Sequence, residues 1–319
     1  MSVLTKQEWI DLETKVAELR DLCMQTTQWG HGGHWGGSSS VADILAALYF
    51  KSANFDFKKY DDPDRDRIVV SKGHAGIMLA SLFSVLGSIP REDLKTFNLT
   101  GSKLGVHLDS NKVKGIDAST GSLGHGSSLA LGMALAGRVQ GRSYKSYVIL
   151  GDGECDEGSV WEAAMAGANF YGRGAENYIT IVDRNKCMID GPTEKVMKLE
   201  PFADKWRAFG YEVIEVDGHN FPQLINAIET AKADKAGKPY AIIANTLKGY
   251  GVAFAEDNYL HHYGMYPPEK CVIAREDLAK VAKARLDVAK SFKKDTVEVE
   301  DLAGIKTITK KDWYVEEAK

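Results

Sequence analysis

The stretch YVILGDGECDEG, residues 147–158, indicates both a fold class and the position of a ligand site within it. Its first four residues are apolar or aromatic and predict a buried strand, and the glycines that follow predict a turn that leads into a helix. Glycines let backbone N–H groups approach a ligand closely, and a helix N-terminus favours anionic oxygens. The acidic side chain of Asp152 would repel an anion unless a cation lay between them. The stretch therefore predicts an anion site with a bound cation at a strand end.

A second polar side chain follows the next predicted strand. Residues 179–183 read ITIVD, and Arg184 and Asn185 come directly after them. Ligands of parallel sheets bind at the carboxyl ends of neighbouring strands, so we expect the carboxamide oxygen of Asn185 near Asp152, where both suit a hard cation such as Mg²⁺. Taken singly, GDG is equally well a tight turn and Asn185 a helix or turn cap. Their occurrence on consecutive strands favours the ligand site.

Strand-like and helix-like segments alternate along the chain. Runs of β-branched residues predict strands at 67–70, 147–150, 178–182, 211–216 and 240–245. Helical spacing predicts an opening amphipathic helix, a helix at 41–50 after a Gly- and Ser-rich stretch at 29–40, and helices near 77–86, 127–138, 160–170, 202–209 and 221–232. This order predicts an α/β fold with a parallel sheet flanked by helices on both faces. We expect residues 1–270 to form that domain, and a basic helix with a mixed-charge tail, residues 271–319, to form a partner-docking arm.

Composition excludes several classes of function. The 319 residues are 44% hydrophobic and 26% charged, with a formal net charge of −4. A chain of this charge gives no reason to expect nucleic-acid binding. Its longest apolar stretches have only strand length, so we expect no membrane span. The four cysteines are scattered without metal or disulfide spacing, which favours reduced thiols in the cytoplasm.

The two motifs together resemble a known family. A GDG sequence followed by Asn, with 31 residues between Gly153 and Asn185, is similar to the signature of thiamine diphosphate enzymes. The surrounding residues, from 16 to 266, resemble transketolase in particular. The resemblance implies the thiamine diphosphate-binding fold, with thiamine diphosphate and Mg²⁺, or another divalent cation such as Ca²⁺ or Mn²⁺, as cofactors. It implies that Asp152, Asn185 and the backbone carbonyl of Cys187 are the metal ligands.

Further cofactor contacts follow from the same resemblance. It implies that Gly151 and Gly153 lie at the diphosphate and that Ile189 packs against the thiazolium ring. Glu157, which is also expected among the cofactor-binding residues, and Glu162 match a pair of acidic residues at the family's subunit interface, beneath the cofactors.

Four of the eight histidines lie in strings that resemble transketolase motifs. The strings are GHWG with VAD (His34), RDR with SKGH (His74), LGVH (His107), and the segment after Lys248-Gly249 (His262). Imidazoles titrate near neutral pH, so they can move a hydroxyl proton or stabilise a developing oxyanion, as cleavage of a ketose C–C bond requires.

The resemblance implies that these four histidines are catalytic. His34 and His262 would face the substrate, and His74 and His262 would also contact the cofactor. The adjacent His261 leaves the register at His262 open. A lone histidine beside glycines is usually a polar loop residue, and we interpret His31 and His219 in that way.

The segment STGSLGHG, residues 119–126, precedes an Ala- and Gly-rich helix. Backbone carbonyls of such an open loop can accept a hydrogen bond from an exocyclic amino group. The resemblance implies that Gly121, Ser122 and Leu123 contact the pyrimidine end of the cofactor. Two departures from the family pattern stay open, His125 in place of a glutamine and Trp35 in place of a proline. Either of them fits a less usual donor, such as a modified sugar, and His125 fits equally well as a simple replacement for the glutamine.

In transketolases, the glutamate that activates the pyrimidine ring belongs to a second, pyrimidine-binding domain. Residues 297–319 show no βαβ pattern that would begin such a domain. The resemblance therefore implies a split enzyme, a heterotetramer in which this chain is the N-terminal subunit, paired with a C-terminal partner. The pair would transfer a two-carbon ketol unit from a ketose phosphate or modified sugar to an aldose. The identity of both sugars stays open, because the family's sugar-phosphate contacts lie largely in the other half.

Two alternatives carry the same GDG and Asn. An alpha subunit of a 2-oxo acid dehydrogenase would not be expected to contain both the SKGH string and the STGSLG loop. A non-catalytic scaffold that keeps the cofactor-binding fold is the other alternative, and the retained Asp152, Asn185 and Glu157 argue against it.

Overall fold

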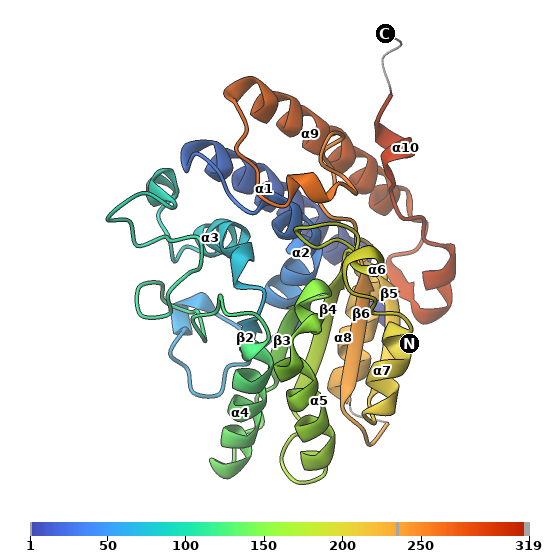
Figure 1. Ribbon diagram of the computed structural model, residues 1–319. Coiled ribbons are helices and arrows are strands. Elements are labelled where there is room, and N and C mark those ends of the chain that lie inside the picture. Colours follow the sequence, from blue (N-terminus) through green and yellow to red (C-terminus); the bar gives the residue numbers. More distant parts are fainter. Residues whose placement is uncertain (1, 234–235, 316–319) are drawn as a thin grey trace.

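The computed structural model describes residues 2–233 and 236–315, and strands and helices alternate through them (Figure 1). The strands are β1 Ser2–Thr5, β2 Arg67–Val70, β3 Ser146–Gly151, β4 Tyr178–Arg184, β5 Glu212–Asp217, β6 Tyr240–Asn245 and β7 Thr296–Glu298. The α-helices are α1 Lys6–Trp29, α2 Trp35–Ala47, α3 Gly76–Val85, α4 His125–Val139, α5 Gly158–Phe170, α6 Thr193–Val196, α7 Phe202–Ala208, α8 Phe221–Ala233, α9 Pro268–Ser291 and α10 Lys310–Trp313. None of these helices is long and apolar enough to span a membrane.

Five parallel strands form the central sheet in the order β2-β3-β4-β6-β5. All five carry β-branched residues, and each matches a strand that the sequence predicted to within two residues at either end. Two apolar cores cover the two faces. Ile149 and Ile181 face the core formed with α1, α2, α3 and α8, whereas Val148 and Val182 face the core formed with α4, α5 and α7. The predicted α/β fold with helices on both faces is therefore confirmed.

Helix α2 begins at Trp35, earlier than the helix that the sequence predicted at 41–50. Gly36, Gly37 and the serines at 38–40 lie inside it, although glycine weakens an isolated helix. A Cβ at Gly36 would come within 2.8 Å of the His261 carbonyl oxygen and 2.9 Å of Lys248 Cγ. Small residues are therefore required where two loops press on the helix, and this packing outweighs intrinsic propensity.

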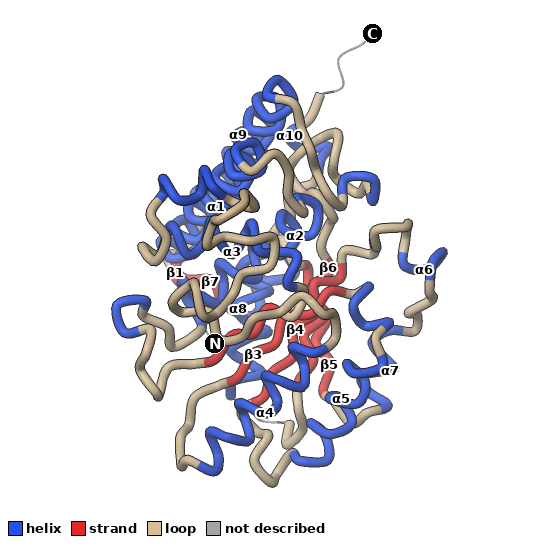
Figure 2. Tube along the Cα trace, turned by 60° about the vertical axis from the view of Figure 1, so that its left-hand side comes forward, coloured by secondary structure: helices blue, strands red, loops and turns tan. Residues whose placement is uncertain are grey.

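The C-terminal region packs on the N-terminal region of the same chain. Helix α9 lies along α1 (Figures 1 and 2), and β7 pairs antiparallel with β1 in a small second sheet that the sequence pattern did not reveal. Cys271 and Leu278 of α9 share one core with Leu19 of α1. The division into residues 1–270 and a docking arm at 271–319 stays a prediction, and any docking by this arm must use the faces that α1 and β1 leave free.

A buried charge network joins α1, α2 and α9. Asp43 of α2 is fully buried, and Arg20 and Arg285 pair with its carboxylate, the Arg285 Nη2 atom at 2.7 Å. His219 Nδ1 lies 2.8 Å from Asp43 Oδ2, so His219 is a polar loop residue, as expected, but it is buried and belongs to this network. Burial alone would raise the pKa of Asp43, but Arg20 and Arg285 hold that pKa well below its usual range. The Asp43 charge is therefore part of the packing of these helices.

Replacing Asp43 with Asn should lower the free energy of unfolding by about 3–5 kcal/mol, because Arg20 is left in the core without its counter-charge and Arg285 keeps only its ion pair with Glu13. Urea unfolding followed by circular dichroism measures the change. The matched control is Asp287→Asn on α9, whose ion pair with Lys283 is exposed (57% and 78%) and should be worth less than about 1 kcal/mol. Equal costs for the two variants would contradict this role of the network.

Candidate active site

Asp152 and Asn185 follow neighbouring strands of the sheet. Strands β3 and β4 run parallel with Gly151 opposite Asp183, so the residues after each strand emerge at the same edge. Both side chains line one cavity. Lys72 follows β2 and Lys248 follows β6, and both also reach this cavity. Four carboxyl strand ends therefore converge on one site, as expected for ligand binding in a parallel sheet.

The cavity has a volume of about 320 Å³. It is lined by His34, Gly37, Lys72, His74, His107, Gly121, Leu123, Gly151, Asp152, Gly153, Glu154, Asn185, Cys187, Met188, Ile189, Lys248 and His262. All but two of the site residues predicted from the sequence are in this set. The exceptions, Ser122 and Glu157, are exposed at the surface of the chain, and their cofactor contacts stay predictions.

The Asp152 carboxylate is fixed by the turn around it. Gly153 N donates to Oδ1 (2.8 Å), Lys186 N donates to Oδ2, and Arg184 Nη1 lies 3.2 Å from Oδ2. Burial raises the pKa of Asp152 to about 6, against the opposing effect of Arg184. A second cation beside this carboxylate would favour its ionised form.

Asn185 is held in the cavity wall by α2 and by its own turn. Its Nδ2 donates to Ser40 Oγ (3.2 Å), and its Oδ1 accepts from Cys187 N (3.1 Å). The described residues contain no group of three or more His, Cys, Asp or Glu side chains that could hold a metal. The predicted ligands instead offer one carboxylate, one carboxamide oxygen and one peptide oxygen. That donor set fits a hard cation whose remaining ligands come from a phosphate group.

Two buried lysines, which were not predicted from the sequence, bring positive charge into the cavity. Lys72 Nζ lies 2.6 Å from Asp183 Oδ2 and donates to the Gly37 carbonyl oxygen (2.9 Å). Lys248 Nζ donates to the carbonyl oxygens of Cys187 (3.1 Å) and Met188 (3.0 Å). Burial, with Lys72 nearby, lowers the pKa of Lys248 to about 8, so it stays mostly charged at pH 7. Each lysine follows a predicted strand, and this position is the signal that could have pointed to both.

Three imidazole rings form a triangle in the cavity. The ring centroids of His34 and His74 are 5.3 Å apart, those of His34 and His262 are 5.2 Å apart, and those of His74 and His262 are 5.3 Å apart. The ring centroid of His107 lies 6.5 Å from that of His34. These four histidines belong to separate motifs in the sequence, and the fold brings them to one wall.

The triangle is uncharged at neutral pH. Burial, followed by His107 and the nearby lysines, lowers the pKa of His34 to about 4, and burial with Lys248 lowers the pKa of His262 to about 3. Burial and Lys72 hold the pKa of His74 well below its usual range. Neutral imidazoles can donate or accept hydrogen bonds, so this wall suits sugar hydroxyls.

These shifts predict a dependence of stability on pH. As pH falls through about 6.5, histidines of the unfolded chain bind protons that the folded cavity rejects, so the free energy of unfolding should fall. His262→Asn removes one such group, so the free energy of unfolding of the variant should fall less steeply between pH 6.5 and 5. The two slopes should differ by less than about 1.4 kcal/mol per pH unit. Urea midpoints at pH 7, 6 and 5 measure both slopes. Identical slopes for the wild type and the variant would contradict the assignment.

The structure resolves the register at the paired histidines. His262 lines the cavity, with Nδ1 2.8 Å from Lys248 Nζ, whereas His261 Nδ1 lies 3.1 Å from the Tyr266 hydroxyl, outside the cavity. Trp35 is fully buried in the core and does not line the cavity, so a direct contact with donor sugar is not supported. His125 is exposed at the first position of α4, also outside the cavity.

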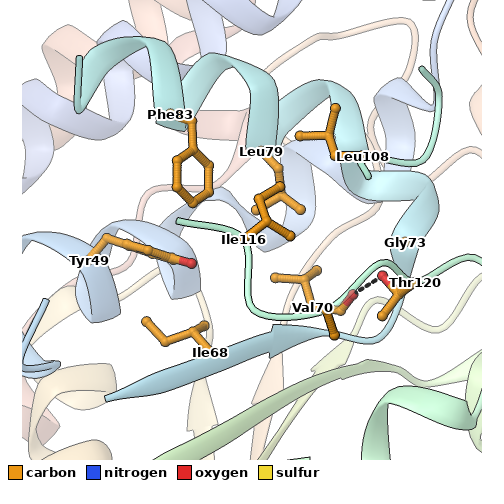
Figure 3. Close-up of a pocket in the computed structure, with 10 residues that line it drawn as sticks. Tyr49, Ile68, Val70, Gly73, Leu79, Phe83, Leu108, Ile116 and Thr120 are labelled. Carbon is orange, nitrogen blue, oxygen red and sulfur yellow. Dashed lines mark hydrogen bonds between the residues drawn. The ribbon is translucent and has the colours of Figure 1, made fainter. Parts of the chain in front are cut away.

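A packed apolar cluster holds the predicted pyrimidine loop in place. Figure 3 shows Tyr49, Ile68, Val70, Leu79, Phe83, Leu108 and Ile116 turned toward one another, with Gly73 and Thr120 at the edge of the cluster. Thr120 Oγ1 donates to the Val70 carbonyl oxygen (2.6 Å). A Cβ at Gly73 would come within 2.6 Å of Thr120 backbone atoms. The space left here is only about 10 Å³, room for one water, so the cluster serves packing and presses Thr120 against the SKGH turn.

The fold and the cavity together define a thiamine diphosphate-binding domain, and comparison with known proteins agrees. The family model for the transketolase thiamine diphosphate binding domain matches residues 12–301. The chain belongs to the transketolase family. These matches do not support the 2-oxo acid dehydrogenase alternative.

Individual relatives include subunits of about this length. The chain is 43% identical over 256 residues to a 6-deoxy-6-sulfo-D-fructose transketolase subunit, SqwG, of Clostridium sp. (strain MSTE9), covering 80% of this chain and 92% of the relative. It is 38% identical to an apulose-4-phosphate transketolase subunit of Phocaeicola vulgatus, covering 81% and 90%. A transketolase structure from Campylobacter jejuni superimposes with a TM-score of 0.77 at 29% identity, covering 87% of this chain. The chain spans about half of that structure, 46% of its length.

Proposed function

We propose that this chain is the thiamine diphosphate-binding subunit of a two-chain transketolase, which transfers a two-carbon ketol unit from a ketose to an aldose. One observation supports this most: a single cavity joins Asp152 and Asn185, two buried lysines and a triangle of neutral imidazoles. The lysines and strand ends suit a diphosphate with its cation. The imidazoles suit hydroxyl groups of a sugar.

Each part of the cavity has a role in this proposal. Asp152, Asn185 and the Cys187 carbonyl would hold Mg²⁺ or a similar divalent cation, and the lysines would neutralise the diphosphate. When bound, thiamine diphosphate supplies the carbanion chemistry for C–C bond cleavage. His34 and His262 would accept or return protons at the donor hydroxyls, with His74 on the cofactor side and His107 at the outer side.

We also propose a C-terminal partner that carries the pyrimidine-binding domain and its activating glutamate. Both relatives described above are named as subunits. Ile189, Leu260 and Met265 are 60%, 71% and 75% exposed. Ile189 lies at the cavity itself, and the other two flank His262 in sequence. Exposed apolar side chains around a polar cavity are typical of a surface that another protein covers, and this supports the proposed partner.

A heterotetramer would require a second contact, and α4 and α5 offer one. These helices pack side by side, and they expose Leu129 (44%), Val139 (88%), Met165 (58%) and Phe170 (39%). Glu162 of α5 is exposed as well. We propose that two copies of this chain pair across these two helices, with one partner chain on each.

The double variant Leu129→Glu, Met165→Glu should reduce the complex to one copy of each chain, because buried carboxylates would repel across the pairing axis. Light scattering coupled to size exclusion measures the mass. Leu99→Glu is the matched control, since Leu99 is similarly exposed (41%) but lies outside these helices. An unchanged mass for the double variant would reject this interface.

The proposal extends to the chemical class of the donor sugar. The relatives act, by their names, on a sulfonated and a phosphorylated ketose. We propose an anionic ketose as donor and a cytoplasmic location, which the four free, buried cysteines favour. The test is a ketol-transfer assay of the chain with its partner on both ketoses and on unmodified fructose. Transfer from an anionic donor is expected, whereas a cofactor-loaded pair that transfers from none of them would reject the proposal.

A further inference from the structure

Glu154 is a buried carboxylate (3% exposed) between three loops that belong to separate motifs of the sequence. Its Oε2 accepts from Gly151 N (3.0 Å) in the GDG turn. Its Oε1 accepts from Gly124 N (2.8 Å) in the STGSLG loop and from the Ser71 hydroxyl in the SKGH string. The described residues give Glu154 no lysine, arginine or histidine within salt-bridge distance, so N–H and O–H donors are its direct partners, with the charge of Lys72 acting from farther away.

Ser71 extends this junction to the start of α4. Its Oγ accepts from Gly126 N (3.1 Å) while its hydroxyl donates to Glu154. A Cβ at Gly126 would come within 2.5 Å of Ser71 Cβ, and a Cβ at Gly124 within 2.3 Å of Ser159 Oγ. The loop is therefore packed tightly on both sides, and the Glu154 carboxylate holds it directly at Gly124 N and, through the Ser71 hydroxyl, at Gly126 N.

We propose that Glu154 is a positioning residue, which sets the pyrimidine loop at a fixed distance from the diphosphate turn so that one cofactor can span both. This inference rests on the proposed function, because only a ligand with two ends needs the two loops in register. Glu154 bonds the GDG turn at Gly151 N, and its carboxylate makes no hydrogen bond to the predicted metal ligands in the described structure. Replacing Glu154 should therefore weaken binding at the pyrimidine end of the ligand more than binding at its diphosphate end.

The test compares two ligands on the full-length chain with Mg²⁺ present, namely thiamine diphosphate, which spans both loops, and inorganic pyrophosphate, which needs only the diphosphate side. In Glu154→Gln an amide NH₂ faces a backbone N–H or the Ser71 hydroxyl. Calorimetric affinity for thiamine diphosphate should fall about tenfold or more. Affinity for pyrophosphate should change by less than about threefold. An equal loss for both ligands, or no loss, would overturn the inference.

Two further variants keep the test decisive if Glu154→Gln does not fold. Ser71→Ala removes one donor and should shift the ratio of the two affinities in the same direction. The double variant should be no worse than the more severe single one, because both changes break one junction. Asp156→Asn is the matched control in the same turn, since the Asp156 side chain bonds neither loop, and should keep the wild-type ratio. A wild-type chain that binds no thiamine diphosphate, even with its partner chain present, would instead refute the proposed function itself.

Discussion

Purified without a partner, this chain should turn over ketose donors at least about 1,000-fold more slowly than the two-chain complex. The cavity described above supplies the cation ligands, the lysines and the imidazoles. The proposed activating glutamate acts on the other end of the cofactor, as a proton-transfer group, and such groups contribute about 10²–10⁴ in rate. The partner would also cover Ile189, which is 60% exposed, and exclude water from the reacting atoms.

The measurement is the rate of aldose-dependent ketol transfer with saturating thiamine diphosphate and Mg²⁺, as the partner chain is added to a fixed amount of this chain. The rate should rise from near background and saturate at one partner per chain. A partner whose corresponding glutamate is replaced by Gln is the control, because it should bind without restoring the rate. Full activity of the single chain would contradict the proposed division of labour.

Asp152→Asn should weaken Mg²⁺-dependent binding of thiamine diphosphate by at least about 100-fold. Loss of a residue that only supports a metal ligand commonly costs about 10–100-fold, and loss of a charged ligand should reach or exceed the upper end. Asn keeps the size of the side chain but removes the charge that attracts the cation, and its NH₂ group faces the N–H of Gly153 or Lys186. Without the cation, the diphosphate faces only the lysines and backbone N–H groups.

Affinity for the cofactor at fixed Mg²⁺ is the readout, with the thermal unfolding midpoint of the free chain as a check of folding. Asp190→Asn is the matched control. Asp190 is an exposed carboxylate next to Ile189 in sequence, and it does not line the cavity. A variant at Asp152 that keeps the wild-type affinity while Mg²⁺ is still required would remove Asp152 from the ligand set.

Local sequence patterns were sufficient for the sheet because its central strands are buried on both faces. Residues 147–150 are all apolar or aromatic, as is typical of a strand buried on both faces. The Gly151–Asp152 turn marks the end of this run. From strand order alone, Asp152 and Asn185 could be expected at one edge, and the structure places both in one cavity. The fold class was therefore predictable, as was the position of the site.

Contacts between distant segments were not predictable. Helix α2 starts within a Gly-rich segment because loops from residues 248 and 261 pass close to Gly36. Strand β7 forms only because β1 lies beside it. Glu154 had no visible role, since its partners Ser71 and Gly124 are far from it in sequence. Lys72 and Lys248 lie two and three residues after the ends of β2 and β6, and strand position alone does not show that their side chains turn into the cavity.

Whether a cation joins this site to its cofactor is best decided by a calorimetric titration of the full-length chain with thiamine diphosphate, once with millimolar Mg²⁺ and once with a chelator. We expect saturable binding of one cofactor per chain with Mg²⁺ and at least about tenfold weaker binding without it, because the cation links Asp152 and Asn185 to the diphosphate. No binding with Mg²⁺, or equal binding in the chelator, would contradict this expectation.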